Sequence, residues 1–246
     1  MTEVTREVAL ITGATGGIGS AIARQLVADG FDLALSDVAF ESVHNDFLKE
    51  IQSYGTRVKT FPVDALDLPG VNALVPAALA AFGRLDVLVN VAGIVVFQEL
   101  ASNSDADFER VLHINLRLAF VLSREASKVL PPGGRIVNIG SVVADRVPAP
   151  GLSLYAMAKS ALAGLTRASA RDLGPKQIRV NCVQPGPIDT ALNPADSELA
   201  PQQVEATTLG RFGQPDEVAA LVGFLARPDS GYMTGSVHNV DGGFNT

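Results

Sequence analysis

The sequence contains a single cysteine, Cys182, and only three histidines, so it is poor in the residues that form disulfides and bind metals. One thiol excludes an intramolecular disulfide and any site built from several cysteines. His44, His113 and His238 are widely spaced and indicate no metal cluster. We therefore expect no metal site, and we interpret Cys182, which falls in an apolar run, as an inert buried thiol.

Long hydrophobic runs are also missing. The longest apolar stretches are short strand-like runs and an alanine-rich segment, 71–82, which Asn72 and Pro76 interrupt, and none of them could span a bilayer. The beginning of the sequence carries acidic residues and no apolar core, so it does not resemble a secretory signal. We expect a cytoplasmic protein.

Positive charge is scarce, because 19 lysines and arginines face 26 acidic residues and leave a formal net charge of −7. Nucleic acids and anionic membranes are recognised by clustered basic residues, so neither is expected as a partner. The expected partner is a small molecule.

What the sequence does contain is a regular alternation of two kinds of segment. Seven apolar, β-branched runs are typical of strands, namely Val8–Thr12, Leu33–Ser36, Val58–Val63, Val87–Asn90, Arg135–Ile139, Ile178–Val183 and Val237–Val240. Between them lie six helical patterns, at Gly17–Asp29, Glu41–Tyr54, Pro69–Phe82, Asp105–Leu130, Ser153–Leu173 and Pro215–Ala226. Each helix can connect two parallel strands.

This alternation predicts the α/β class. Most of the strands are continuous hydrophobic runs, as expected when a parallel sheet is covered on both faces. We predict one domain over residues 1–246, with a doubly wound parallel sheet of seven strands and helices on both faces. The least regular segment, 185–210, follows a predicted strand and is expected to be a loop that closes over a substrate.

A glycine-rich turn, Thr12–Gly19, joins the first predicted strand to the first helix. Glycines allow a tight turn and let backbone N–H groups at the helix N-terminus approach a pyrophosphate. The spacing is Gly-x-x-x-Gly-x-Gly, which differs from the generic dinucleotide fingerprint, and a purely structural turn is the alternative. Its place between a strand and a helix favours a Rossmann-type nucleotide site.

The second strand ends at Asp37, where a carboxylate can accept hydrogen bonds from the adenosine ribose and repel a 2′-phosphate. We therefore expect NAD as the cofactor. As an alternative, Asp37 caps the next helix. No lysine or arginine occupies the positions where a cation could neutralise such a phosphate, namely Thr15, Gly16, Val38 and Ala39.

Tyr155 and Lys159 are spaced i, i+4 at the start of a predicted helix, so they share one helix face. A positive charge beside a phenol favours its ionised form, and we expect Lys159 to lower the pKa of Tyr155. Tyrosine then serves as an acid or base. Ser141 follows a predicted strand, at the edge where α/β sheets place ligands, and could hydrogen-bond a substrate oxygen.

Together these motifs resemble the short-chain dehydrogenase/reductase family over essentially the full length of the chain. The resemblance is carried by Thr12–Gly19, Asp64, Asn90-Val91-Ala92-Gly93, Asn115, Ser141, Tyr155, Lys159 and Pro185–Thr190. One departure is Val91, which stands where the family usually has a second asparagine.

The resemblance implies specific roles in catalysis. Tyr155 would protonate a carbonyl oxygen or deprotonate an alcohol, and Ser141 would hold that oxygen. Lys159 would bind the nicotinamide ribose and tune Tyr155, while Asn115 would anchor a water that links Lys159 to solvent.

The resemblance also implies a set of cofactor contacts. Asp64 and Ala65 would flank the adenine, and Ile188 and Thr190 would fix the nicotinamide carboxamide. The complete set of expected cofactor-binding residues is Gly13, Thr15, Gly17, Ile18, Gly19, Asp37, Asp64, Ala65, Asn90, Ala92, Gly93, Tyr155, Lys159, Pro185, Gly186, Ile188 and Thr190.

We expect the substrate to be an apolar ketone or secondary alcohol, because the candidate pocket walls are apolar, although some of them could be core. These residues are Ile94, Val95, Val96, Val142, Val143, Leu152 and Leu192. Two alternatives remain. The sequence is also similar to 3-oxoacyl-carrier-protein reductases, for which Arg146, Arg171 and Lys176 could supply a basic patch, and a non-catalytic nucleotide-binding protein could share the fold.

The resemblance finally implies a homotetramer. Helices 105–130 and 153–173 would pack across one interface, and residues 231–246 would lie at another. These helices carry apolar residues on more than one face.

Overall fold

The computed structural model describes residues 6–38, 40 and 45–246, and its centre is a parallel sheet of seven strands. The order across the sheet is β3-β2-β1-β4-β5-β6-β7. The strands are β1 Val8–Thr12, β2 Asp32–Asp37, β3 Val58–Pro62, β4 Val87–Asn90, β5 Arg135–Ile139, β6 Arg179–Pro185 and β7 Val237–Val240. The chain reverses direction across the sheet after β3, so the neighbouring strands β1 and β4 form its topological switch point.

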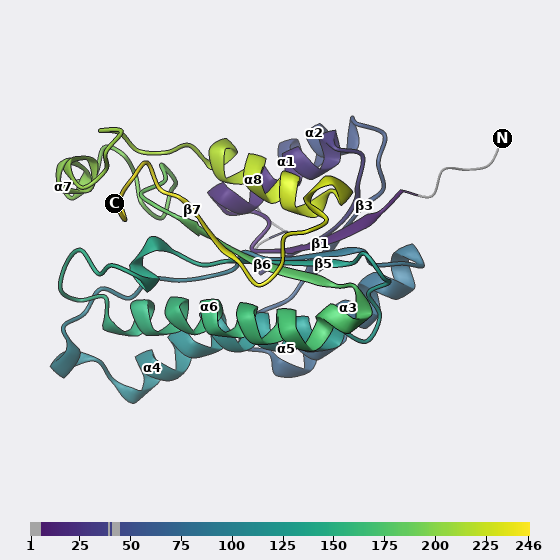
Figure 1. Ribbon diagram of the computed structural model, residues 1–246, viewed down its shortest axis with the longest axis horizontal. Helices are drawn as coiled ribbons and strands as arrows, with labels where there is room; N and C mark the ends of the chain where they lie inside the picture. The colour runs from purple at the N-terminus through teal and green to yellow at the C-terminus, as the bar shows by residue number, and fades with distance from the viewer. Residues whose placement is uncertain (1–5, 39, 41–44) are drawn as a thin grey trace.

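Helices cover both faces of the sheet, as Figure 1 shows, with α1, α2 and α8 on one face and α3 to α6 on the other. The helices are α1 Gly17–Ala28, α2 Asn45–Gln52, α3 Leu68–Phe82, α4 Asp105–Leu112, α5 Leu118–Ala126, α6 Ser153–Leu173, α7 Ala200–Glu205 and α8 Pro215–Ala226. The predicted doubly wound, single-domain Rossmann fold is confirmed. No helix among the described residues is long and apolar enough to cross a membrane.

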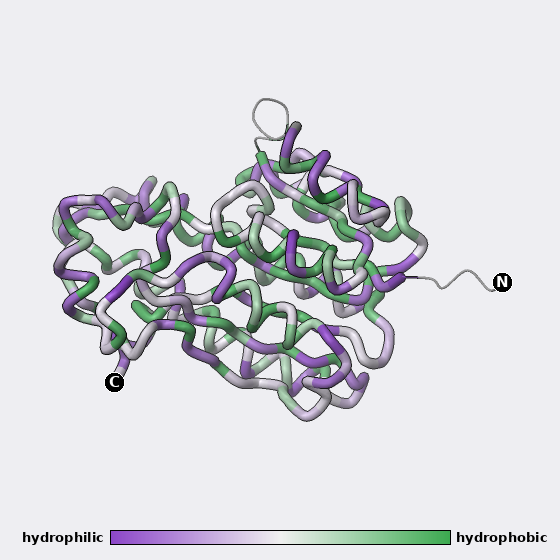
Figure 2. Tube along the Cα trace, turned by 90° about the horizontal axis from the view of Figure 1, so that it is seen from above, coloured by the Kyte–Doolittle hydropathy of each residue, from purple (hydrophilic) through white to green (hydrophobic). Residues whose placement is uncertain are grey.

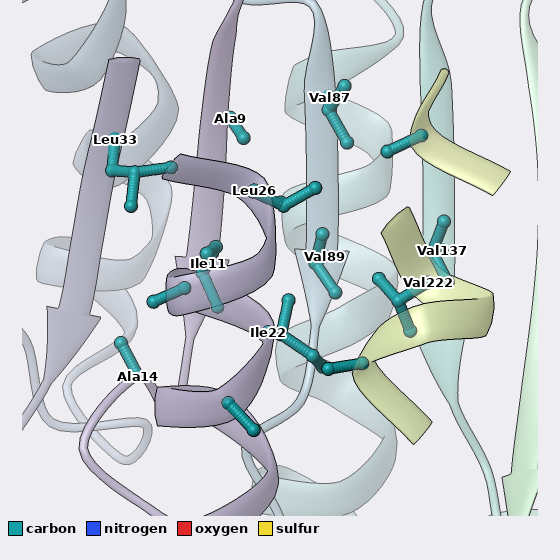
Figure 3. Packing of buried hydrophobic residues seen from close by; sticks show 14 of the residues in the cluster. Ala9, Ile11, Ala14, Ile22, Leu26, Leu33, Val87, Val89, Val137 and Val222 are labelled. Atoms are coloured by element: carbon teal, nitrogen blue, oxygen red, sulfur yellow. The ribbon is translucent and has the colours of Figure 1, made fainter. Parts of the chain in front are cut away.

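The core has two main parts, one on each face of the sheet. On the α1 and α8 side, Ile22 and Leu26 of α1 and Val222 of α8 pack over Ile11 and Val137, as Figure 3 shows. A separate cluster lies between the sheet and α3, α5 and α6. Figure 2 shows hydrophobic and hydrophilic residues alternating along the covering helices, as expected for helices that bury one side.

The amino edge of the sheet, where the strands begin, is closed by charged groups. Asp86, which is 1% exposed, accepts hydrogen bonds from the backbone N–H of Val8 at 2.8 Å and from two nitrogens of Arg84, each at 2.8 Å. Arg135 at the start of β5 is paired with Glu7 at 2.8 Å. Breaking such a buried pair leaves an uncompensated charge, so these contacts fix the edge.

Charged contacts also close the amino edge at the starts of β2 and β6. Asp32 at the start of β2 accepts a 2.6 Å hydrogen bond from Arg57. Arg179 at the start of β6 donates to the backbone oxygen of Ser230 at 2.8 Å and to that of Arg227 at 3.0 Å. This buried guanidinium therefore satisfies carbonyls just beyond the end of α8, where a helix presents partial negative charge.

The structure differs from the predicted elements mainly in two places. The predicted helix 105–130 is divided, because a π-helical turn, His113–Arg117, separates α4 from α5, which ends at Ala126. The predicted loop 185–210 contains the short helix α7. The predicted start of the helix at 41–54 lies outside the described residues, and its described part is α2.

Candidate active site

The glycine-rich turn lies at the carboxyl edge of the sheet, next to the switch point. Gly13 has a φ of +62°, and a Cβ there would lie 2.8 Å from the Cα of Ala92. A Cβ on Gly19 would overlap the carbonyl oxygen of Gly13, and one on Gly17 would lie 2.7 Å from Thr190. A side chain is therefore excluded at these three glycines, and their absence of side chains keeps the backbone at the N-terminus of α1 open to a phosphate-bearing ligand.

Asp37, the last residue of β2, is hydrogen-bonded to this turn. One of its carboxylate oxygens accepts from the backbone N–H of Thr15 at 3.0 Å and from its hydroxyl at 2.6 Å. The other accepts from the N–H of Val38 at 2.7 Å. Among the described residues no bond supports the alternative role as a helix cap, so Asp37 presents its negative charge beside the turn.

The ends of the two neighbouring strands expose apolar side chains. Val38 follows β2 and is 68% exposed, and Leu66, which lies beyond β3, is 49% exposed. The Asp64 carboxylate accepts a hydrogen bond from the N–H of Leu66 at 2.9 Å and so shapes the segment that contains Ala65. An exposed apolar surface of this kind suits a flat aromatic ring such as adenine.

Asn90 lies at the switch point but directs its amide into the protein. The amide nitrogen donates to Asn138 at 2.8 Å and to the hydroxyl of Ser123 at 3.3 Å, and Asn138 donates to Thr166 at 2.9 Å. These polar groups link β4 and β5 to helices α5 and α6. The expected contact of Asn90 with a cofactor therefore stays a prediction.

Thr12 joins the glycine turn to the segment after β4. Its hydroxyl accepts hydrogen bonds from the N–H groups of Val91 at 3.1 Å and Ala92 at 3.4 Å. The backbone of Val91 makes this contact, so the departure from the family motif at this position leaves the turn intact.

Ser141, Tyr155 and Lys159 meet at one wall of a cavity of about 370 Å³. Ser141 follows β5, while Tyr155 and Lys159 lie one turn apart on α6. The Lys159 ammonium donates a 2.8 Å hydrogen bond to the backbone oxygen of Ile139 and lies 5.7 Å from the centroid of the Tyr155 ring. The spacing in the sequence therefore predicted a real cluster.

Burial governs the protonation of this cluster. It raises the pKa of Tyr155, and a hydrogen bond with Ser141 offsets only part of the effect. It also lowers the pKa of Lys159 to about 8. The pKa of Tyr155 is therefore raised and not lowered as expected, because desolvation of the phenolate is the largest cause and the opposing one is the hydrogen bond with Ser141, not the Lys159 ammonium.

Asn115 lies in the π-helical turn between α4 and α5. Its side-chain oxygen accepts from the N–H of Ile94 and its nitrogen donates to the Ile94 carbonyl, both at 2.8 Å. A Cβ on Gly93 would lie 2.8 Å from this oxygen and 3.3 Å from the Lys159 ammonium. Gly93 thus lets Asn115 and Lys159 approach the same point, and π turns are frequent at functional sites.

The cavity is lined mostly by apolar side chains, as expected. The predicted wall residues Val95, Val142, Val143, Leu152 and Leu192 line it. Ile94 and Val96 pack instead against a small core cluster with Val111, Leu154 and Ala158. Sequence reasoning missed Phe97, Phe244 and several residues of segment 185–210, because no local pattern indicates which distant segments close a pocket.

The segment 185–210 forms the outer wall of the cavity. Leu192, Leu199 and Gln202 line the cavity, and α7 lies within this segment. The amides of Asn193 and Gln203 bond each other in both directions, at 2.8 and 2.9 Å. This exchange ties the extended part of the segment to α7, and segment 185–210 is called the lid below.

Comparisons with known proteins agree with this arrangement. A family described as "Enoyl-(Acyl carrier protein) reductase" matches residues 13–245. The "Cyclic-di-GMP-binding biofilm dispersal mediator protein" of Escherichia coli (strain K12) is 40% identical over 240 residues, which cover 98% of each chain.

Two solved structures are similar along nearly the whole chain. A short-chain dehydrogenase from Burkholderia cenocepacia J2315 in complex with NADP is 40% identical, with a TM-score of 0.96 over 99% of this chain and 100% of that one. A blue fluorescent protein from a metagenomic library in complex with NADPH is 43% identical, with a TM-score of 0.95 over 98% of each chain. A nicotinamide cofactor therefore accompanies this fold in close structural neighbours.

Proposed function

Because the chain belongs to the short-chain dehydrogenase/reductase family, we propose that this oxidoreductase interconverts a secondary alcohol and a ketone with NAD(H). The meeting of Ser141, Tyr155 and Lys159 at one wall of an apolar cavity carries the proposal. The cofactor, when bound, supplies or accepts the hydride. The cavity suits an apolar substrate whose only polar contact need be the reacting oxygen.

In the reductive direction Tyr155 donates its phenolic proton to the carbonyl oxygen. Its raised pKa keeps the phenol protonated at neutral pH, as a general acid requires. Ser141 hydrogen-bonds the same oxygen as negative charge develops on it. Lys159 binds the nicotinamide ribose and holds the donor network in place, and Asn115 anchors the water through which Tyr155 regains its proton.

The cofactor would lie along the carboxyl edge from β2 to β6. Thr15, Ile18 and the glycines of the turn face the pyrophosphate and ribose, while Asp64 and Ala65 flank the adenine. Close packing around Gly13, Gly17 and Gly19 supports this fit, since an added Cβ would collide in each case. The remaining contacts come from Asn90, Ala92, Gly93, Lys159, Pro185, Gly186, Ile188 and Thr190.

Asp37 favours NAD over NADP. Its carboxylate accepts hydrogen bonds from the N–H and the hydroxyl of Thr15, and its negative charge would repel a 2′-phosphate. The two solved neighbours bind NADP or NADPH, so the proposed preference for NAD rests on Asp37 and not on the neighbours.

The test is the initial rate with NADH and with NADPH over apolar ketones, diketones and a 3-oxoacyl thioester. We expect faster turnover of ketones with NADH. Asp37→Ala should reduce the preference for NADH by about tenfold, the value of one charged hydrogen bond. Asp46→Ala, which removes an exposed carboxylate from α2, is the charge-matched control. An unchanged preference in Asp37→Ala would assign cofactor choice to other residues.

A 3-oxoacyl-thioester reductase is the alternative function, and the description of the matching family shares with it the acyl-carrier-protein substrate but names the reduction of an enoyl group. NADPH-dependent turnover of the thioester alone would select this alternative. If the protein binds NADH but turns over none of these substrates, the result would select the other alternative, a non-catalytic nucleotide-binding protein.

A homotetramer is the expected assembly. Phe108, Phe120 and Met157 on α4, α5 and α6 are 39%, 47% and 42% exposed, which leaves an apolar face on these helices. Sedimentation equilibrium measures the mass, and a monomer at micromolar concentration would contradict this expectation.

A further inference from the structure

The end of the chain, Asp241–Thr246, forms a wall of the cavity to which the proposed function gives no role. Phe244 is only 2% exposed although two residues follow it, and its side chain lies among the cavity-lining residues. Figure 1 shows the C-terminus beside the segment that carries α7. Terminal residues are usually loosely held, so the burial of this aromatic ring requires specific contacts.

The tail is folded upon itself. The two oxygens of the Asp241 carboxylate accept from the backbone N–H of Gly243 at 3.0 Å and of Asn245 at 3.1 Å. The N–H of Phe244 donates to the Asp241 backbone oxygen at 3.1 Å. This compact turn fixes the direction in which the Phe244 ring leaves the backbone.

One side of the tail is bonded to the lid. The N–H of Leu209 donates to the Gly242 carbonyl at 3.0 Å, and the hydroxyl of Thr208 donates to the Gly243 carbonyl at 3.1 Å. Gly243 has a φ of +80°, and a Cβ on it would lie 2.7 Å from the Cβ of Thr208. The close approach therefore depends on glycine at this position.

The other side of the tail is held by Arg146, which follows β5 and lines the same cavity. Its guanidinium donates to the Phe244 carbonyl and lies 5.1 Å from the centroid of the Phe244 ring. No carboxylate within the described part of the chain forms an ion pair with Arg146, so its contacts to the tail are its principal ones. A cation over an aromatic face adds to the hydrogen bond.

We propose that Asp241–Thr246 is a latch that joins the lid to the Arg146 wall, and that Phe244 is a specificity-determining residue. Its ring limits the size of the apolar group that a ketone can place beside the reacting carbonyl. This inference rests on the proposed function for its substrate class. Discrimination by one hydrophobic wall changes relative rates by roughly tenfold for each methylene of misfit.

The first test measures kcat/KM with NADH for a series of methyl ketones whose second substituent grows from ethyl to phenyl. Phe244→Leu and Phe244→Ala should raise the rate ratio of the largest to the smallest ketone by about tenfold. The dissociation constant for NADH should stay the same. A ratio equal to that of the unchanged protein would overturn the proposal, because a merely structural residue would lower all rates together.

Phe82→Leu is the matched control for this test. Phe82 is also buried, and Arg57 lies 5.1 Å from its ring centroid, but the pair is at the amino edge of the sheet. Both leucine variants lose similar aromatic packing, whereas only Phe244→Leu should alter the ratio. If Phe82→Leu shifts the ratio equally, the effect is general loosening and the proposal fails.

A second test needs no substrate. Arg146→Ala should loosen the lid, so a glutamate-specific protease should cut after Glu198 and Glu205 faster than in the unchanged protein, with the Glu50 site as the internal reference. Equal cleavage rates would overturn the latch. Faster cleavage in a protein that reduces no ketone would keep the latch and reject the proposed function.

Discussion

The two edges of the sheet are built from the same strands but have opposite characters. At the amino edge, charged side chains are paired with each other or with backbone groups, as with Asp86 and Arg84 or Arg179 and the carbonyls beyond α8. The carboxyl edge borders the glycine-rich turn, an apolar cavity and the buried cation Lys159 of α6. Burial lowers the pKa of Lys159. Most charged groups of the amino edge thus have charged or backbone partners, whereas Lys159 at the carboxyl edge donates to a single backbone oxygen, that of Ile139.

This difference indicates that the amino edge stabilises the fold and the carboxyl edge binds the ligand. Paired groups stabilise the fold, because a buried charge that loses its partner is poorly solvated by the protein interior. Unpaired and desolvated groups destabilise it, and they persist where they bind or transform a ligand. Substitutions at the two edges should therefore separate stability from activity.

The largest expected effect is at the carboxyl edge. Tyr155→Phe keeps the ring but removes the transferred proton, so kcat should fall by roughly 10³-fold, the usual contribution of a general acid. NADH binding, measured by fluorescence titration, and the melting temperature should change little. Undiminished turnover would remove Tyr155 from the mechanism.

At the amino edge the effect should be on stability. Asp86→Ala leaves the buried N–H of Val8 without its acceptor, whereas the partly exposed Arg84 regains water, and the free energy of unfolding should fall by about 2 kcal/mol. The turnover per folded molecule should be unchanged. Urea denaturation measures the loss, with Glu50→Ala, which breaks the exposed pair with Arg24, as the control. A loss no larger than that of the control would show that the edge is not a stabilising feature.

The last expected effect is a gain in stability at the carboxyl edge. Lys159 has a pKa of about 8 in the folded chain against 10.5 as its ordinary value. The unfolded state therefore binds more protons between these two values, and stability rises with pH across that window. Below pH 8 the burial of the ammonium therefore costs about 3 kcal/mol.

Lys159→Met should accordingly raise the melting temperature at pH 7 and abolish activity. Its advantage should shrink as the pH rises toward 10. Lys49→Met, at an exposed position on α2, provides the comparison and should show no such pH dependence. A melting temperature at pH 7 below that of the unchanged protein would contradict this account.

The sequence predicted local relations between residues better than long-range contacts. Parallel strands such as Val87–Asn90 were found with their observed limits, because uninterrupted burial leaves a simple hydrophobic signal. The i, i+4 spacing of Tyr155 and Lys159 on one helix also determined their proximity. In each case the relation is local, and local geometry follows from the periodicity of the chain.

Long-range relations were not predictable in this way. The amide of Asn90 bonds Asn138 and Ser123, residues whose pairing depends on strand order. The π turn around Asn115 has no periodic signature, since one widened turn leaves the apolar pattern of residues 105–126 almost unaltered. The place of Phe244 in the cavity depends on a tail whose contacts are all with distant segments.

The packing of α1 against α8 has a consequence for how the chain acquires its structure. These helices lie next to each other on one face of the sheet, yet almost the whole sequence separates them (Figure 1). Gly223 of α8 approaches Gln25 of α1 so closely that a Cβ would lie 2.7 Å from its Cγ. During synthesis the apolar side of α1 must therefore wait for α8 to leave the ribosome. Contacts between such distant segments make folding slow, so the native packing of α1 forms only after α8 has been synthesised.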